Sequence, residues 1–328
     1  MDKYFNSLFF KIFIIVTFLS VFFNGCRLDE GSDDDSGKSP GTIKNWVYQL
    51  QNADPTEISN SGFELIVIDY SSNGEESGEY SNVQISKIKN SDKLPIAYLS
   101  IGEAEDYRFY WEAKWKTDPP VWLGRENPEW KGNYKVKFWE KEWKDIVFSY
   151  MDRIIAHGFS GVYLDIVDAF EYWSDDEIEK DLTLTETDAA ERMIDFIKEI
   201  SDYGRSKAGE DFMVIPQNGE RIIDFDKNDL YINSITGIGI EDLFYNETSA
   251  VKESETEYRI NFIYKIIKRG KIVFSIDYVD NGSGYSGNNK KRIDDYYEKC
   301  KKRGYLPYAG LSDRELDELN VINDIQPK

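Results

Sequence analysis

The stretch Gly161-Val162-Tyr163-Leu164-Asp165-Ile166-Val167-Asp168 joins an apolar run to two carboxylates. A short, continuous apolar run of this kind is typical of a parallel strand that is buried on both faces. A carboxylate in such a strand costs free energy unless it has partners or a chemical task. The stretch therefore predicts a buried strand whose carboxyl end carries carboxylates with a structural or catalytic role.

Helical patterns flank this strand, and the same alternation recurs along the chain. Residues 138–156 and 187–203 place apolar side chains three and four positions apart, which is the period of an amphipathic helix. Eight strands alternating with helices predict a single (β/α)8 TIM barrel, an α/β fold. An open doubly wound sheet is disfavoured because no Gly-x-Gly-x-x-Gly motif follows the first strand. The eight strands are expected at Trp46–Leu50, Leu65–Tyr70, Ile96–Ile101, Gly161–Val167, Phe212–Pro216, Ile235–Ile240, Ile272–Tyr278 and Tyr305–Leu311.

Capping signals predict where further helices begin and end. Asp54-Pro55 and Ser81 are typical of helix N-termini, and glycines are typical of helix C-termini. Ser312 with Glu315 forms a capping-box pattern, which predicts a last short helix. Helices over residues 253–269 and 289–303 are expected to end at Gly270 and Gly304.

The N-terminal segment is predicted to direct export. Lys3 and Lys11 precede an apolar run over residues 12–23, which is typical of a signal peptide. The following Gly25-Cys26 resembles a bacterial lipoprotein site, so residues 1–25 are expected to be removed and Cys26 to carry lipid. Residues 26–42 are acidic and rich in Gly and Ser, as in a flexible tether. We expect residues 43–328 to form the barrel, lipid-anchored to a bacterial membrane; an uncleaved anchor is the alternative.

Composition excludes several classes of function. The chain has 61 acidic and 40 basic side chains and a net charge of −21. Residues 1–25 carry +1 and residues 26–42 carry −3, so residues 43–328 carry −19. Such a domain would repel nucleic acid. A single His, His157, excludes a His-rich zinc site and makes a Ser-His-Asp triad improbable. No metal and no cofactor is predicted.

Polar residues collect where the predicted strands end, which is where a (β/α)8 barrel keeps its active site. Two carboxylates that act without His or metal are typical of a glycosidase, and aromatic rings offer faces to sugars. The segment 103–137 holds four Trp residues, which predicts either a lid or wall of the cleft, or a satellite core beneath a long loop. The candidate residues on this rim are Asp69, Tyr98, Glu103, Glu105, Asp165, Asp168, Tyr172, Gln217, Asn218, Glu220, Glu241, Asp277 and Tyr278.

Three motifs carry a family resemblance: Tyr98-Leu99-Ser100-Ile101-Gly102-Glu103-Ala104-Glu105 with Tyr107-Arg108, then residues 161–168, then Pro216-Gln217-Asn218-Gly219-Glu220. In this order they resemble glycoside hydrolase family 114, the endo-α-1,4-polygalactosaminidase family of (β/α)8 barrels. The resemblance implies hydrolysis, with retention, of an α-linked galactosamine exopolysaccharide.

The resemblance also implies roles for individual residues. Asp165 would be the nucleophile and Glu220 the acid/base, while the choice between Asp165 and Asp168 stays open. A de-acetylated polymer is cationic and would be attracted by the acidic domain. The alternative is a lipoprotein that binds polysaccharide without cleaving it. The residues implied to shape the subsites are Asp69, Glu103, Glu105, Arg108, Asp168, Gln217, Asn218, Glu241 and Asp277.

Overall fold

The computed structural model describes residues 43–175 and 184–327. The predicted signal peptide, the acidic tether and Cys26 lie outside these residues. Within the described ranges, no helix is both long and apolar enough to cross a membrane.

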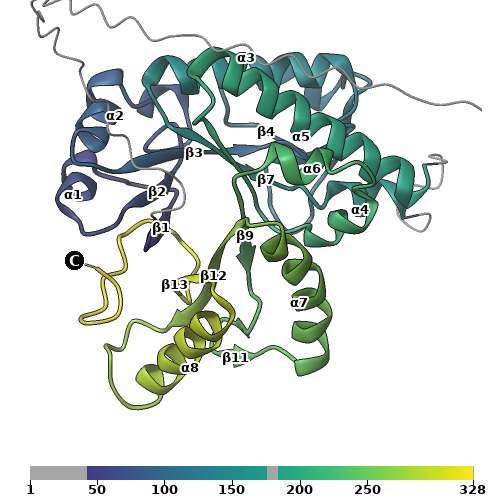
Figure 1. Ribbon diagram of the computed structural model, residues 1–328. Coiled ribbons are helices and arrows are strands. Elements are labelled where there is room, and N and C mark those ends of the chain that lie inside the picture. Colours follow the sequence, from purple (N-terminus) through teal and green to yellow (C-terminus); the bar gives the residue numbers. More distant parts are fainter. Residues whose placement is uncertain (1–42, 176–183, 328) are drawn as a thin grey trace, which may run out of the picture. The chain divides into compact units, whose positions relative to one another are not determined.

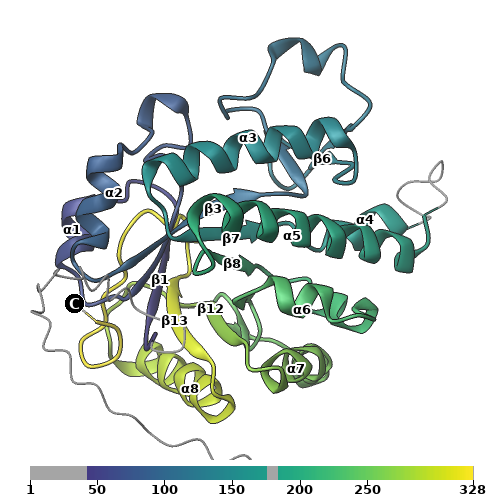
Figure 2. The same ribbon diagram turned by 45° about the horizontal axis from the view of Figure 1, so that its top comes forward.

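All eight predicted barrel strands are confirmed, with bounds that shift by up to a few residues. Helices lie between them and surround the strands (Figures 1 and 2). The barrel strands are β1 (Trp46–Gln49), β2 (Leu65–Ile68), β3 (Leu94–Ser100), β7 (Gly161–Asp165), β8 (Met213–Pro216), β9 (Gly237–Glu241), β12 (Ile272–Asp280) and β13 (Leu306–Leu311).

The strands form two parallel sheets that together close the barrel. One sheet has the order β1-β2-β3-β7-β8 and the other the order β13-β12-β9. At one junction, Gln217 after β8 pairs with Gly239 of β9 in a parallel bridge. At the other, the indole Nε1 of Trp46 donates to the carbonyl of Leu306, 2.9 Å away. The wall is therefore continuous, and the carboxyl ends of all eight strands meet on one face.

The helices begin and end largely where the capping signals predict. Asp54 accepts the N–H of Thr56 at the start of α1, and Ser81 with Gln84 forms a capping box on α2. Gly270 and Gly304 follow α7 and α8 with positive φ, as predicted. The helices are α1 (Pro55–Asn60), α2 (Asn82–Lys89), α3 (Lys141–His157), α4 (Ala169–Ser174), α5 (Glu186–Ala208), α6 (Leu230–Ser234), α7 (Glu253–Lys268) and α8 (Gly287–Arg303), with short 3-10 turns η2 (Glu76–Gly78), η3 (Ala113–Lys116) and η4 (Glu220–Phe225).

The predicted last helix is wrong. Residues 312–316 form an irregular segment in which Arg314 and Leu316 have positive φ values of 62° and 51°. The carbonyl of Leu316 accepts the N–H groups of Leu50 (2.8 Å) and Gln51 (3.0 Å), just after β1. These bonds to a distant strand replace the bonds that a helix would make.

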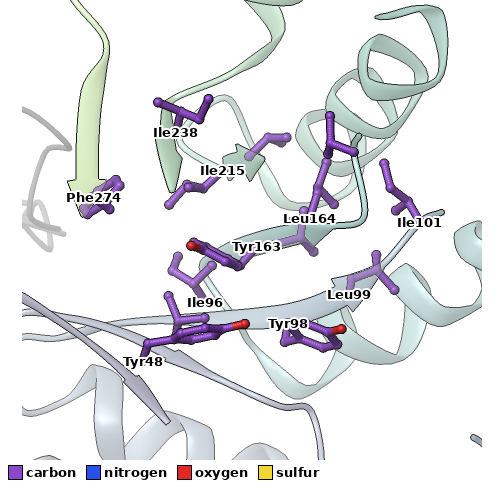
Figure 3. Close-up of a cluster of buried hydrophobic side chains, with 14 of the residues drawn as sticks. Tyr48, Ile96, Tyr98, Leu99, Ile101, Tyr163, Leu164, Ile215, Ile238 and Phe274 are labelled. Carbon is purple, nitrogen blue, oxygen red and sulfur yellow. The ribbon is translucent and has the colours of Figure 1, made fainter. Parts of the chain in front are cut away.

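Aromatic rings fill the barrel interior. Tyr48 and Tyr163 have ring centroids 5.2 Å apart, and Trp46 stacks on both. Figure 3 shows Tyr48, Tyr98 and Tyr163 reaching this core from three different strands. A Cβ on Gly239 would lie 1.9 Å from the Tyr163 hydroxyl oxygen, so β9 needs glycine there to make room for the ring.

The Trp-rich segment serves both predicted purposes. It forms a small antiparallel sheet of β4 (Glu103–Glu105), β5 (Leu123–Glu126) and β6 (Asn133–Val136). Trp115 and Trp122 are buried and pack edge to face, with centroids 5.0 Å apart, which makes a satellite core. Trp130, between β5 and β6, is 62% exposed. A short hairpin, β10 (Tyr245–Asn246) and β11 (Ser249–Ala250), follows β9.

Candidate active site

A cavity of about 520 Å³ opens at the carboxyl ends of the strands. Residues from all eight barrel strands, or from the loops that follow them, contribute to its walls. Eleven of the predicted site residues line it: Asp69, Tyr98, Glu103, Glu105, Arg108, Asp165, Asp168, Gln217, Asn218, Glu241 and Tyr278.

Asp165 lies at the last position of β7, on the floor of this cavity. Its Oδ2 accepts the hydroxyl of Tyr98 at 2.8 Å, and its Oδ1 accepts the N–H of Ile166 at 2.8 Å. Burial raises the pKa of Asp165 to about 7, although both hydrogen bonds oppose the shift, and the charge of Glu241 adds to it. Asp165 is thus held in one orientation and titrates near neutrality.

The backbone directly after Asp165 is strained. Ile166 has a φ of 57°, in the left-handed region that a β-branched residue rarely adopts. A Cβ on Gly102 would lie only 2.2 Å from the carbonyl oxygen of Ile166. Only glycine at position 102 leaves space for this turn, and strain of this kind is often found at functional sites.

Glu241 ends β9 and lines the same cavity. Its carboxylate accepts Gln217 Nε2 at 2.9 Å and the hydroxyl of Tyr278. Burial raises the pKa of Glu241, with a further contribution from the charge of Asp242. In the described part of the chain, no Lys or Arg forms an ion pair with Asp165 or with Glu241. The hydrogen bonds to both carboxylates therefore come only from neutral donors. The nearby charge of Arg314 lowers the pKa of Glu241, and the charge of Glu241 raises the pKa of Asp165.

A second group of carboxylates on the same wall is fully paired. Arg108 Nε donates to Glu105 at 2.6 Å, while Nη2 and Nη1 reach Asp69 at 2.7 and 2.9 Å. The guanidinium also lies against four tyrosine rings, among them Tyr107 at 4.9 Å. Burial raises the pKa of Asp69, and the charge of Arg108 opposes that shift. This group shapes the wall as an ion-pair network.

Glu103 is likewise satisfied by its neighbours. It accepts Lys135 Nζ at 2.5 Å, Asn127 Nδ2 at 2.8 Å and Asn133 Nδ2 at 3.2 Å. Asp168, by contrast, is exposed at the mouth of the cavity. Among the described residues, no cluster of three or more His, Cys, Asp or Glu could hold a metal ion.

The predicted position of Glu220 in this cavity is wrong. Glu220 begins η4 and is only 6% exposed, and Arg259 Nε donates to its Oε1 at 2.5 Å. It lines a neighbouring, more open pocket in front of α7 instead. Since its carboxylate already pairs with Arg259 and lines a different pocket from Asp165, Glu220 is poorly placed to share a substrate bond with Asp165.

Tyr172 and Asp277 also lie away from the cavity, contrary to prediction. Asp277 is fully buried and accepts the N–H groups of Leu243, Phe244 and Tyr245 at 2.8–2.9 Å, so it holds the loop after β9. Burial raises its pKa to about 7. Tyr172 lies on α4 with its ring 5.0 Å from Lys135 Nζ.

Several residues of the cavity were not among the predicted site residues, and three of them have clear contacts or exposure there. Tyr48, near the end of β1, donates its hydroxyl to Gln217 Oε1 at 3.1 Å. Its strand-end position was a usable signal. Trp130 stands at the rim and belongs to the Trp-rich segment, where no signal separated it from its buried neighbours. Arg314 pairs with Asp242 at 2.7 Å and covers the ring of Tyr278, and nothing in its sequence context indicated this.

Sequence comparison relates the chain to a protein family and to proteins from other organisms. The sequence profile of glycoside-hydrolase family GH114 matches residues 29–327. A Thermotoga maritima protein described as uncharacterized is 52% identical over 283 residues, which cover 86% of this chain and 85% of the relative. An uncharacterized Methanocaldococcus jannaschii protein is 53% identical over 276 residues, which cover 84% of this chain and 78% of the relative.

Solved structures agree on the fold at low sequence identity. The glycoside hydrolase domain of PelA from Pseudomonas aeruginosa superposes with a TM-score of 0.61 at 14% identity, covering 85% of this chain and 98% of that domain. Aspergillus fumigatus Ega3, solved in complex with galactosamine, gives 0.61 at 16% identity, with 91% and 99% covered. The profile match spans most of the chain. The chain therefore belongs to glycoside-hydrolase family GH114 and is a glycosidase built on a (β/α)8 barrel.

Proposed function

We propose that this glycosidase cleaves an α-linked amino-sugar polysaccharide, similar to polygalactosamine, by a retaining mechanism with Asp165 as nucleophile and Glu241 as acid/base. One observation carries the proposal. Two carboxylates from β7 and β9 line one cavity, are held only by neutral donors, and both have raised pKa values. A pair of this kind is the equipment of a glycosidase.

The proposed reaction has two steps. Ionised Asp165 attacks the anomeric carbon while Glu241 gives its proton to the departing glycosidic oxygen, which leaves a glycosyl ester on Asp165. Glu241, now a carboxylate, then takes a proton from a water molecule that attacks the same carbon and releases Asp165. The hydrogen bonds from Tyr98 and Ile166 stabilise the Asp165 anion, which supports the nucleophile role. Burial and Asp242 favour protonated Glu241, which supports the acid role.

Charge and aromatic surface support an amino sugar as substrate. Residues 43–328 carry −19, and Asp168 adds an exposed carboxylate at the cavity mouth. A de-acetylated amino sugar carries an ammonium group that such a field would concentrate. Trp130 presents an exposed ring at the rim, against which a sugar face can pack. The structural neighbour Ega3 was solved with galactosamine.

Release of reducing ends from partly de-acetylated α-1,4-galactosamine polymer tests the proposal. We expect release by the parent protein, weaker release from the fully acetylated polymer, and a first product with the α-anomeric configuration by NMR. Added salt should raise KM because it screens the charge attraction. No release would overturn the substrate assignment, and a β-configured first product would overturn the retaining mechanism.

We also propose that the N-terminal segment exports the enzyme and tethers it through a lipid on Cys26. The supporting observation is the apolar run over residues 12–23 that ends at Gly25-Cys26. Expression of the full chain in a bacterium, with metabolic labelling by a palmitate analogue, tests this. The parent should be labelled and sediment with membranes, whereas Cys26→Ser should lose the label; a labelled Cys26→Ser variant would contradict the proposal.

A further inference from the structure

Side chains hold the peptide groups on both sides of Glu241. The N–H of Glu241 donates to Asn218 Oδ1 at 3.0 Å. Arg259 Nη1 donates to the carbonyl of Glu241 at 2.8 Å and to that of Asp242 at 3.3 Å. Arg259 Nη2 also reaches Asn218 Oδ1, at 3.2 Å. Asn218 and Arg259 therefore form one connected bracket around the residue proposed as acid/base.

Arg259 is in turn fixed by Glu220. Its Nε donates to Glu220 Oε1 at 2.5 Å and its Nη2 to Glu220 Oε2 at 3.3 Å. With the three bonds above, this makes five hydrogen bonds, which matches the five N–H groups of a guanidinium. No donor remains for a substrate. Glu220 thus orients Arg259, a role that the sequence did not predict.

The backbone at this point needs such support. Asp242, directly after Glu241, has a φ of 53°, and Asn218 has a φ of 53° as well. Both lie in the left-handed region, which costs free energy outside glycine. Arg259 binds the carbonyl of one strained residue and the side chain of the other. It joins the loops after β8 and β9 at the place where each turns away from the barrel.

We propose that the Glu220–Arg259 pair is a positioning device for Glu241. It fixes the peptide groups of Glu241 so that the carboxyl group points into the cavity toward Asp165. The inference rests on the proposed acid/base role of Glu241. A general acid must lie within hydrogen-bond reach of the oxygen it protonates, and a displacement of about 1 Å costs roughly 100-fold in rate. Glu220 and Arg259 are positioning residues, since they act through Glu241.

Two conservative variants test the device. Arg259→Lys keeps the positive charge but loses the planar fork that makes five bonds. We expect its kcat on the galactosamine polymer to fall roughly 30- to 100-fold, with KM within about twofold of the parent. Glu220→Gln keeps the shape and one acceptor, so its kcat should fall by roughly three- to tenfold.

Matched controls come from two exposed ion pairs, one between α7 and η4 and one beside them. Lys265 of α7 pairs with Asp224 of η4, on the exposed surface. Arg269, at the end of α7, pairs with Asp229. Asp224→Asn and Arg269→Lys change the same kinds of ion pair without touching the bracket around Glu241. Both should keep kcat and KM within about twofold of the parent, because exposed pairs contribute little.

A substrate with a different leaving group distinguishes a loss of Glu241 positioning from general damage to the fold. A 4-nitrophenyl group departs without protonation, so the first step on a 4-nitrophenyl α-galactosaminide oligomer does not need the acid. The nitrophenol burst rate of Arg259→Lys should therefore lie within about threefold of the parent, even though polymer cleavage is much slower. A misfolded or loosened protein would lose both activities together, and thermal unfolding midpoints monitor this independently.

The outcomes distinguish this inference from the proposed function. An equal loss on polymer and on nitrophenyl substrate would overturn the positioning role, and so would parental kinetics of Arg259→Lys. If Glu220→Gln lost as much polymer activity as Glu241→Gln, Glu220 itself would be the acid/base and the inference would fall. A parent protein that releases no reducing ends would instead overturn the proposed function, whatever the variants do.

Discussion

Two groups of carboxylates, one buried and one half-buried, face the same cavity and differ in their partners. Asp69 and Glu105 share the guanidinium of Arg108 and form an ion-pair network. Asp165 and Glu241 accept bonds only from the neutral groups of Tyr98, the backbone, Gln217 and Tyr278.

The difference shows how one barrel rim can carry both structure and chemistry. A buried carboxylate with a cationic partner stays charged and holds its surroundings in place. A buried carboxylate with neutral donors keeps a proton up to higher pH and can exchange it near neutrality. For the carboxylates that line this cavity, a cationic partner accompanies a structural role, and neutral donors accompany the pair proposed for catalysis.

Substitution of Asp165 or Glu241, the two carboxylates with neutral hydrogen-bond donors, should have the largest effect on activity. Asp165→Asn cannot form the glycosyl ester, and Glu241→Gln cannot give or take the proton. We expect each to lower kcat on the polymer by roughly 1,000-fold or more. Asp168→Asn is the informative comparison, because Asp168 is exposed at the mouth and should lose less than about tenfold. A deeper loss in Asp168→Asn than in Asp165→Asn would move the nucleophile to Asp168.

Breaking the ion-pair network should damage stability instead. Arg108→Met leaves Asp69 and Glu105 buried without their cation, which we expect to cost about 3–5 kcal/mol of unfolding free energy at pH 7.5. Urea unfolding measures this. The loss should shrink at pH 5, where the uncompensated carboxylates take up protons. Arg269→Met, at an exposed pair, is the control and should cost less than about 1 kcal/mol. Equal costs for the two variants would contradict the comparison.

The pH dependence of stability should report the raised pKa of Asp165. The pKa of Asp165 is raised to about 7 in the folded protein, above about 3.9 in an unfolded chain. The folded state therefore binds more protons between these values, and stability falls as pH rises through this window. Asp165→Asn removes that loss, so its stability relative to the parent should improve by roughly 2–4 kcal/mol between pH 4 and pH 8.5. A pH-independent difference in urea unfolding would contradict this.

The smallest predicted effect comes from one neutral donor. The Tyr98 hydroxyl lowers the pKa of Asp165, so Tyr98→Phe should raise that pKa and shift the acid limb of the kcat/KM profile to higher pH. Near neutrality, activity should fall roughly tenfold, the worth of one hydrogen bond to a charged group. Tyr70→Phe is the control, since the Tyr70 hydroxyl has no hydrogen-bond partner among the described residues. An unmoved acid limb in Tyr98→Phe would count against the assignment.

The barrel could be predicted from sequence because its signals are local. Buried parallel strands appear as continuous apolar runs, as in Ile96–Ile101, and helix caps such as Ser81 depend on residues within one turn. The last segment could not be predicted, because Leu316 bonds to Leu50 and Gln51 from the other end of the chain. Capping signals depend on neighbouring residues, so they do not reveal a hydrogen-bond partner that is distant in the sequence.

The sequence predicted which residues lie at the strand ends, but not the direction in which each side chain points. Strand ends indicate which residues reach the rim, while alternation along a strand sends neighbours to opposite faces. Tyr278 faces the cavity, and Asp277 beside it turns to the loop after β9. Glu220 follows its strand into a 3-10 turn, where Arg259 of a later helix captures it. The contact between Glu220 and Arg259 is not evident from the sequence, so the sequence alone could not exclude Glu220 as the acid/base.

The wall contributed by residues 314–316 has a consequence for how the enzyme matures. All eight strands are present once the chain has been synthesised as far as Leu311, but Arg314, Glu315 and Leu316 still have to close the cavity. During synthesis, all strands of the barrel are therefore available before the last residues of the cavity wall have been added. Tags or fusion partners attached directly after β13 would lie beside this cavity, so reporters for this enzyme belong elsewhere on its surface.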